Sequence, residues 1–200
     1  MPIELLTALM GFAFVSSITP GPNIMMLMAS GANFGVRRTV PHMMGVGLGH
    51  SFMIVVLGAG LVQVFETYPL TLTVMKWVSV GYLLYLSWKI ANAAPKAPDA
   101  PETGGQPFTF LQAAAFQWVN PKGWFMALTA ISAYTGNQTM REVVIVAVVF
   151  VCTNIPSISF WTVLGQQMRK FLTSPVRLRT FNIVMALLLV ATLIPILRGH

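Results

Sequence analysis

The stretches Thr19-Pro20-Gly21-Pro22-Asn23 and Asn120-Pro121-Lys122-Gly123 decide the fold, because each places proline inside a long apolar run. Proline removes a backbone donor and blocks the carbonyl four residues earlier, so a helix breaks or bends there. The carbonyls of Ser16, Ile18 and Gln117 are therefore expected to lack their usual helical partners. Hydrocarbon tolerates such groups only where they are buried in protein or face a watery cavity.

The composition places these stretches in a membrane. The 200 residues are 56% hydrophobic and 8% charged, whereas soluble globular chains carry about 25% charged residues. A spanning helix needs about 20 apolar residues, so the chain has room for six spans and no second soluble domain. We expect an all-α integral membrane protein, a single domain over residues 1–200. The expected spans are 5–29, 43–64, 70–88, 108–134, 143–165 and 180–197.

The basic residues predict the orientation. Eight of them follow the first, third and fifth expected spans: Arg37, Arg38, Lys89, Lys96, Arg169, Lys170, Arg177 and Arg179. Only Arg141 and Arg198 lie on the other side. Because Lys and Arg collect in cytoplasmic loops, both termini are expected outside. The net charge of +7 is thus explained by topology, and no nucleic-acid partner is expected.

The two halves of the chain resemble each other. Aligning residue 20 with residue 121 gives six identities in sixteen positions: Pro20/Pro121, Met25/Met126, Leu27/Leu128, Ala29/Ala130, Ala32/Ala133 and Gly35/Gly136. This pattern predicts a duplication, with repeat one at 1–88, a linker at 89–107 and repeat two at 108–200. Because each repeat has three spans, the second is expected to be inverted. Inverted repeats with interrupted helices at equivalent positions are typical of transporters with a central site.

The breaks also predict a ligand. Each half-helix that begins after a break offers free N–H groups and a positive dipole end to an anion, and the free carbonyls attract an ammonium. This polarity suits a small zwitterion such as an amino acid. The expected substrate-binding residues are Pro20, Gly21, Pro22, Asn23, Asn120, Pro121 and Lys122. A single proline kink is often only structural, but two breaks in register favour function.

Further polar residues lie inside the expected spans. Lys122 is the only charged residue well inside the fourth span, and a charge in a membrane is a functional candidate by default. It could hold a carboxylate or lose its proton during the cycle. His50, Asn154 and Asn182 are candidates for coupling or pore lining, or equally for interior hydrogen bonding. Three scattered histidines and a single cysteine, Cys152, predict neither a metal nor another cofactor.

Several strings make the chain resemble the LysE/RhtB family of bacterial amino-acid exporters. They are Thr19-Pro20-Gly21-Pro22-Asn23, Gly35-Val36-Arg37-Arg38, Lys76-Trp77 with Gly81-Tyr82-Leu83 and Tyr85-Leu86, and Asn120-Pro121-Lys122. The resemblance covers essentially the whole chain and implies proton-driven export of amino acids or close derivatives across the bacterial cytoplasmic membrane. It implies the same seven substrate-binding residues. Some members carry an Asp near the position of Asn154, so coupling here lacks its usual carboxylate.

Two other functions are weighed against a secondary transporter. A passive channel would be expected to have rings of charge along its pore, and the spans carry none. An intramembrane hydrolase could use Ser30 as nucleophile and His50 as base, but neither a GxSxG nor an HExxH motif occurs. We therefore expect a transporter in the lipid bilayer rather than an enzyme. A homodimer is compatible with this interpretation.

Overall fold

The computed structural model describes residues 1–61, 67–68, 70–93, 106–136 and 139–198, and no strand occurs among them. The first half comprises α1 (Ile3–Ile18), α2 (Pro22–Phe34), α3 (Val36–Val56) with a π-helical turn η1 (Leu57–Leu61), and α5 (Leu70–Ala91). The second half comprises α6 (Phe110–Phe116), a 3-10 turn η2 (Gln117–Val119), α7 (Pro121–Tyr134), α8 (Met140–Met168), α9 (Pro175–Ala191) and α10 (Leu193–Arg198). The expected all-α class is confirmed for these residues.

The proline stretches break helices at both expected places. The axes of α1 and α2 meet at 53°, and together the two helices are long and apolar enough for one bent span. Val36–Leu61 and Met140–Met168 are each long and apolar enough to cross a membrane alone. In the second half, α6 ends in η2, and α7 begins at Pro121. The count of six spans stays a prediction.

Several expected boundaries were wrong. Helix α3, which corresponds to the second expected span, begins at Val36 rather than at residue 43. It begins this early because Gly35 (φ +80°) reverses the chain by itself. Here only glycine avoids strain. Helix α8 begins at Met140, where the Thr139 side chain caps it by accepting from the Glu142 N–H. The last expected span divides into α9 and α10. The end of expected span two (62–64) and the centre of the expected linker (94–105) lie outside the described residues.

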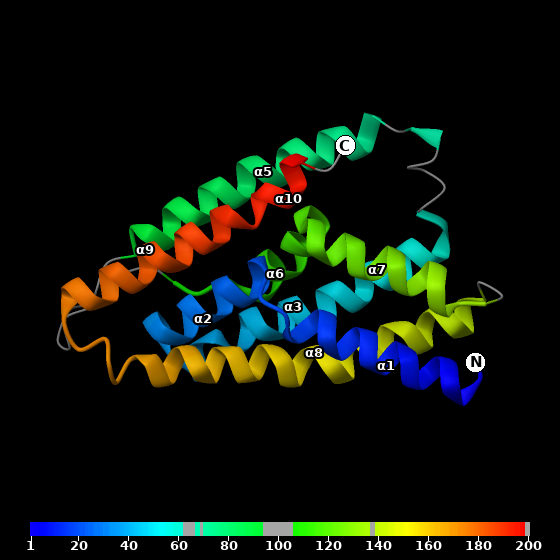
Figure 1. The fold of residues 1–200 in the computed structure, drawn as a ribbon, viewed down its shortest axis with the longest axis horizontal. Helices are drawn as coiled ribbons and strands as arrows, with labels where there is room; N and C mark the ends of the chain where they lie inside the picture. The colour runs from blue at the N-terminus through cyan, green and yellow to red at the C-terminus, as the bar shows by residue number, and fades with distance from the viewer. Residues whose placement is uncertain (62–66, 69, 94–105, 137–138, 199–200) are drawn as a thin grey trace.

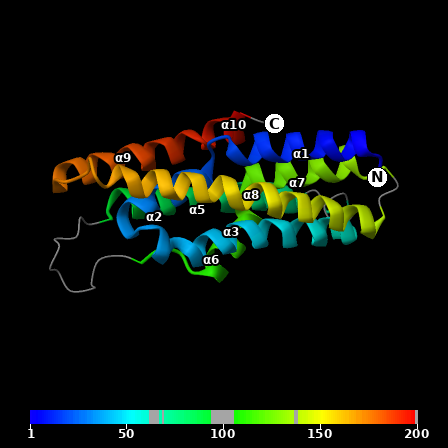
Figure 2. The same ribbon diagram turned by 90° about the horizontal axis from the view of Figure 1, so that it is seen from below.

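Helix α8 is the central element of the bundle. It packs against α1, α2 and α3, whereas α5 packs mainly against α9 along one side of the molecule (Figures 1 and 2). The backbones of α2 and α8 touch: a Cβ added at Gly31 would overlap the Thr162 carbonyl, and one at Gly165 would overlap the Met28 carbonyl. Small residues permit such close approach where helices meet in a membrane. This contact fixes α2, and hence the first break, against the second half.

Equivalent helices of the two halves run in opposite directions. The colour gradient in Figure 1 shows α3 running toward the end of the molecule where the N-terminus lies, whereas α8 runs away from it. The same opposition holds for α5 and α9, and for the half-helices α2 and α7 that follow the two breaks.

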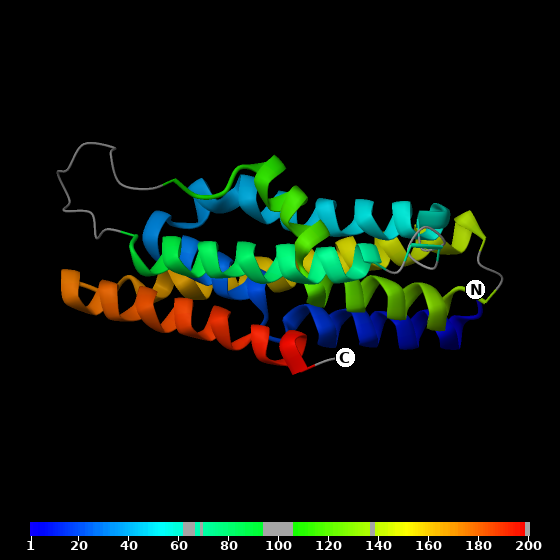
Figure 3. The ribbon, with the colours of Figure 1, turned by 90° about the horizontal axis from the view of Figure 1, so that it is seen from above.

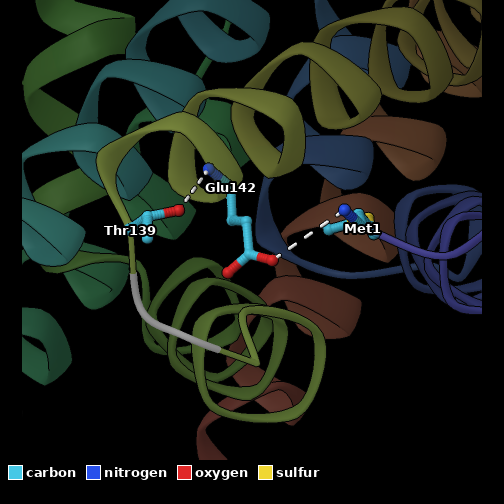
Figure 4. Close-up of polar contacts among 3 residues, drawn as sticks. All are labelled: Met1, Thr139 and Glu142. Carbon is cyan, nitrogen blue, oxygen red and sulfur yellow. Dashed lines mark hydrogen bonds and ion pairs between the residues drawn. The ribbon is translucent and has the colours of Figure 1, made fainter.

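The apolar interior forms two clusters that meet at the level of the breaks. One joins α2, α3, α5, α6 and α9 and contains the fully buried Leu83 and Phe116. The other joins α1, α3, α7 and α8 and contains Leu9 and Phe150. At the outer end of the second cluster the Met1 ammonium lies 4.0 Å from a Glu142 carboxylate oxygen (Figure 4). This ion pair ties the start of α1 to α8.

Candidate functional site

The two breaks meet. The Lys122 ammonium, on the first turn of α7, donates to the Thr19 carbonyl at 2.5 Å. From α8, the Ser157 hydroxyl donates to the Ser17 carbonyl at 2.9 Å, and the Trp161 indole N–H donates to the Ile18 carbonyl at 3.0 Å. Three consecutive carbonyls of the first break are therefore bound by side chains of the second half.

This geometry corrects the expectation of free carbonyls. The Ile18 carbonyl lacks its helical partner but is occupied by Trp161. The Gln117 carbonyl accepts from the Asn120 N–H at 3.2 Å, because the chain tightens into η2 before Pro121. Asn120 then adopts an extended conformation (φ −92°, ψ 103°), and Pro121 begins α7. The second break satisfies this carbonyl from its own backbone.

A pair of amides also joins the breaks. The Asn23 side chain donates to the Gln117 side-chain oxygen at 2.9 Å, and Gln117 donates back to Asn23 at 3.2 Å. Gln117 is fully buried and also donates to the Ala113 carbonyl. The sequence pointed to the Gln117 carbonyl and missed its side chain. A glutamine one turn before a proline in an apolar run was the available signal.

A cavity of about 30 Å³ lies at the breaks, and we call it the break cavity. Its side chains include three with a buried polar atom that has no partner: Ser17 Oγ, His50 Nδ1 and Asn120 Oδ1. Buried polar groups are nearly always paired, so three orphans around one cavity indicate a site for water or a ligand. A volume of 30 Å³ holds a water or two and no amino acid.

Most of the sequence-predicted residues lie at this cavity. Those that line it are Gly21, Pro22, Asn23, His50, Asn120, Lys122 and Asn154. Pro20 and Pro121 shape the bends without lining it. Asn182 does not line this cavity and exchanges hydrogen bonds with Asn33, which agrees with the interior hydrogen bonding left open for it. Gly123, which belongs to the second proline stretch, also lines the cavity. Ser17 lines it too and was missed, because a small polar residue in a helix carries no distinctive pattern.

His50 has a defined hydrogen-bonding state. Its Nε2 lies 3.1 Å from the Gly123 carbonyl oxygen, which can only accept, so Nε2 carries a proton. In the neutral ring, the unpaired Nδ1 is then an acceptor. The hydrolase alternative fails on the same geometry, because Ser30 pairs with Thr39 at 2.9 Å and lies outside the break cavity. Nucleophile and base are not brought together.

The charge at the break cavity is positive. Lys122 is the charged residue among its lining, and no carboxylate is found there within the described part of the chain. The half-helices α2 and α7 both begin at the cavity, so their N-terminal N–H groups add to this potential. The site thus combines a cation with hydrogen-bond acceptors.

A comparison with known protein families gives a match over most of the chain. A family model described as LysE type translocator matches residues 14–194. The chain belongs to this family. The resemblance to the LysE/RhtB family drawn from the sequence is therefore confirmed. With its apolar helices, the chain is a bacterial multi-pass membrane protein.

Several curated proteins similar to this translocator are named cysteine/O-acetylserine efflux protein. The chain is 29% identical over 195 residues to the cysteine/O-acetylserine efflux protein of Escherichia coli O1:K1 / APEC, and the alignment covers 95% of this chain and 96% of that protein. The proteins of the same name from Escherichia coli strain K12 and Shigella sonnei strain Ss046 are each 29% identical over 197 residues, with the same shares covered. No solved structure matches the chain significantly.

Proposed function

We propose that this translocator exports a small amino acid or an O-acylated amino acid, of the cysteine/O-acetylserine type, from the bacterial cytoplasm. One observation carries the proposal: two broken helices meet at a cavity where buried polar atoms of Ser17, His50 and Asn120 have no partner. The family and the printed names of its relatives support an amino acid as the solute.

The chemistry of the break cavity suits a zwitterion. His50 Nδ1 and Asn120 Oδ1 are acceptors, and they fit an ammonium group. Lys122 has three N–H donors and uses one on the Thr19 carbonyl. The others, with the N–H groups at the start of α2 and α7, fit a carboxylate. The substrate-binding residues expected from the sequence are retained in this proposal, with Pro20 and Pro121 acting through the bends.

Alternating access between two inverted repeats completes the proposal. Its support is the opposite direction of the equivalent helices and the meeting of their two breaks (Figure 1). A cavity of about 30 Å³ is too small for an amino acid, so the halves must move apart before the solute enters. The same small volume favours a carrier over an open channel.

Orientation and driving force follow the same proposal. With the basic loops in the cytoplasm, both termini lie outside. Helix α2 then extends from the first break to the cytoplasmic side. The proton gradient drives export, with His50 and Lys122 as the titratable groups at the break cavity, because Asn154 offers no carboxylate there.

The test is export from proteoliposomes loaded with labelled L-cysteine or O-acetyl-L-serine, with and without a pH gradient. Lys122→Ala should lower the initial rate about tenfold or more, since a hydrogen bond to a charged group is worth roughly 1.5–3 kcal/mol. Lys170→Ala, an exposed lysine outside the break, is the matched control. Equal rates for wild type and Lys122→Ala would contradict the proposal.

A further inference from the structure

A second and larger cavity lies at the far end of α2. Its volume is about 370 Å³, within the range of small-molecule sites. It is bounded by α2, the start of α3, the end of α5 and the residues that precede α6, and Figure 3 shows these segments at one end of the molecule. We call it the basic-end cavity, because Arg37 and Arg38 lie on the first turn of α3, about one turn before its lining residue His42.

His42 of α3 lines this cavity and is 2% exposed, and neither of its ring nitrogens has a hydrogen-bond partner. Every other orphaned buried side-chain atom found in the described residues belongs to a residue that lines the break cavity. The imidazole packs against the Phe108 ring in a tilted arrangement, with centroids 5.2 Å apart and an interplanar angle of 40°. An imidazole fixed in place with both nitrogens unpaired indicates a ligand position.

Ser30 of α2 adds an acceptor on the same side. The Thr39 hydroxyl donates to the Gly35 carbonyl at 2.8 Å, so in the contact between the two hydroxyls Ser30 is the donor. Because a hydroxyl has one proton and two lone pairs, the Ser30 oxygen can only accept from a ligand. Ser30 and one nitrogen of a neutral His42 ring are thus two acceptors on the lining of the cavity.

The lining of the cavity also carries a cation. Lys89, near the end of α5, places its ammonium 5.5 Å above the Phe108 ring, the same ring that packs on His42. No carboxylate lines the basic-end cavity among the described residues. Trp88 and Leu86 supply apolar surface beside it. The cavity therefore offers a cation for a carboxylate, acceptors for an ammonium, and an apolar wall for a side chain.

We propose that the basic-end cavity is a second binding site, which takes a small α-amino acid with its carboxylate at Lys89 and its ammonium at His42 and Ser30. The inference rests on the proposed function for the identity of the solute. The basic-end cavity has room for an amino acid, whereas the break cavity does not. An exporter with this arrangement collects its solute at the basic end before the breaks open.

The test is equilibrium binding to purified protein in lipid nanodiscs, with L-cysteine, its methyl ester and N-acetyl-L-cysteine under reducing conditions. Lys89→Gln should raise the Kd for L-cysteine about fivefold and leave the Kd for the ester unchanged, since the ester has no carboxylate. His42→Leu and Ser30→Ala should each weaken L-cysteine binding and spare N-acetyl-L-cysteine, which has no ammonium. Lys170→Gln is the matched control for charge.

The outcomes separate this inference from the proposed function. If wild-type protein binds neither L-cysteine nor O-acetyl-L-serine, the proposed substrate class is wrong. Suppose that wild type binds L-cysteine. If Lys89→Gln then weakens the binding of L-cysteine and of its methyl ester equally, or changes neither, the second site is wrong and the export function is untouched. Binding that survives in Lys122→Ala but falls in the Lys122→Ala/Lys89→Gln double variant supports two sites.

Discussion

The two helix breaks have similar sequences but satisfy their backbones differently. At the first break the carbonyls of Ser17, Ile18 and Thr19 are bound by side chains of the other half of the chain. At the second break the Gln117 carbonyl is bound by the Asn120 N–H, and the Trp118 carbonyl by the indole of Trp124, within the same half. These three carbonyls of the first break depend on the second half, whereas these two carbonyls of the second break are satisfied within their own half.

This difference has a consequence for transport. In the proposed alternating-access cycle, separation of the two halves would leave these two carbonyls of the second break paired, but would remove up to three partners from the first break at once. Unpaired carbonyls are costly in a buried setting, and a substrate ammonium can replace the lost donors. In this proposal the first break is therefore the part of the site that both binding and movement involve, and the second break is the rigid part.

The largest effect is expected at Gly21. A Cβ at this position would lie 2.7 Å from Lys122 Cδ and 3.3 Å from Lys122 Nζ, while the backbone of Gly21 is extended (φ −167°) and accepts alanine. Gly21→Ala should displace the lysine from the Thr19 carbonyl and lower export about tenfold, with little loss of thermal stability. Initial export rates and Tm of the purified protein measure the two effects.

A double-mutant cycle sharpens this prediction. If Gly21→Ala acts through the lysine, it should add little to Lys122→Ala, because coupled residues are not additive. The equivalent change at the second break, Gly123→Ala, meets only ordinary contacts of 3.4 Å or more and should leave Lys122 in place. Gly11→Ala, where a Cβ meets nothing within 4 Å, is the neutral control. Full additivity of Gly21→Ala and Lys122→Ala would refute the mechanism.

The sequence predicted the positions of the breaks and most of their lining, because proline acts locally and its effect on a helix is independent of the rest of the fold. It predicted Lys122 for the same reason, since a charge in an apolar run is visible without a structure. It could not predict the partners of Ile18 and Asn23. Those partners, Trp161 and Gln117, are 143 and 94 residues away, and only packing brings them there.

The errors have physical causes too. Gly35 was treated as part of a longer connection, but its positive φ lets one residue reverse the chain and adds two turns to α3. Asn182 was a candidate for coupling or pore lining, or equally for interior hydrogen bonding, because it is polar within an apolar helix. It pairs with Asn33 between α9 and α2, which agrees with the second of these roles.

An intermediate effect is expected at the amide pair. Gln117→Ala removes a buried amide and leaves the half-buried Asn23 amide without its partner, which should cost roughly 2 kcal/mol and lower the Tm by about 4–8 °C for a chain of this size. Gln112→Ala, in the exposed cap of α6, should lower it by less. The double variant Asn23→Ala/Gln117→Ala should be less destabilised than the sum of the single variants, and strict additivity would argue against the pair.

The smallest effects are expected when the indoles of Trp161 and Trp124 are replaced. Trp161→Phe and Trp124→Phe each remove one N–H donor from a break carbonyl, at a cost of about 1 kcal/mol apiece. Both should lower the Tm by about 2–4 °C, but only Trp161→Phe should change the export rate, because its indole joins the two halves. Trp77→Phe, at a position 60% exposed, is the control. If Trp124→Phe changed export as much as Trp161→Phe, the second break would not be the rigid one, and the contrast between the two breaks would have to be abandoned.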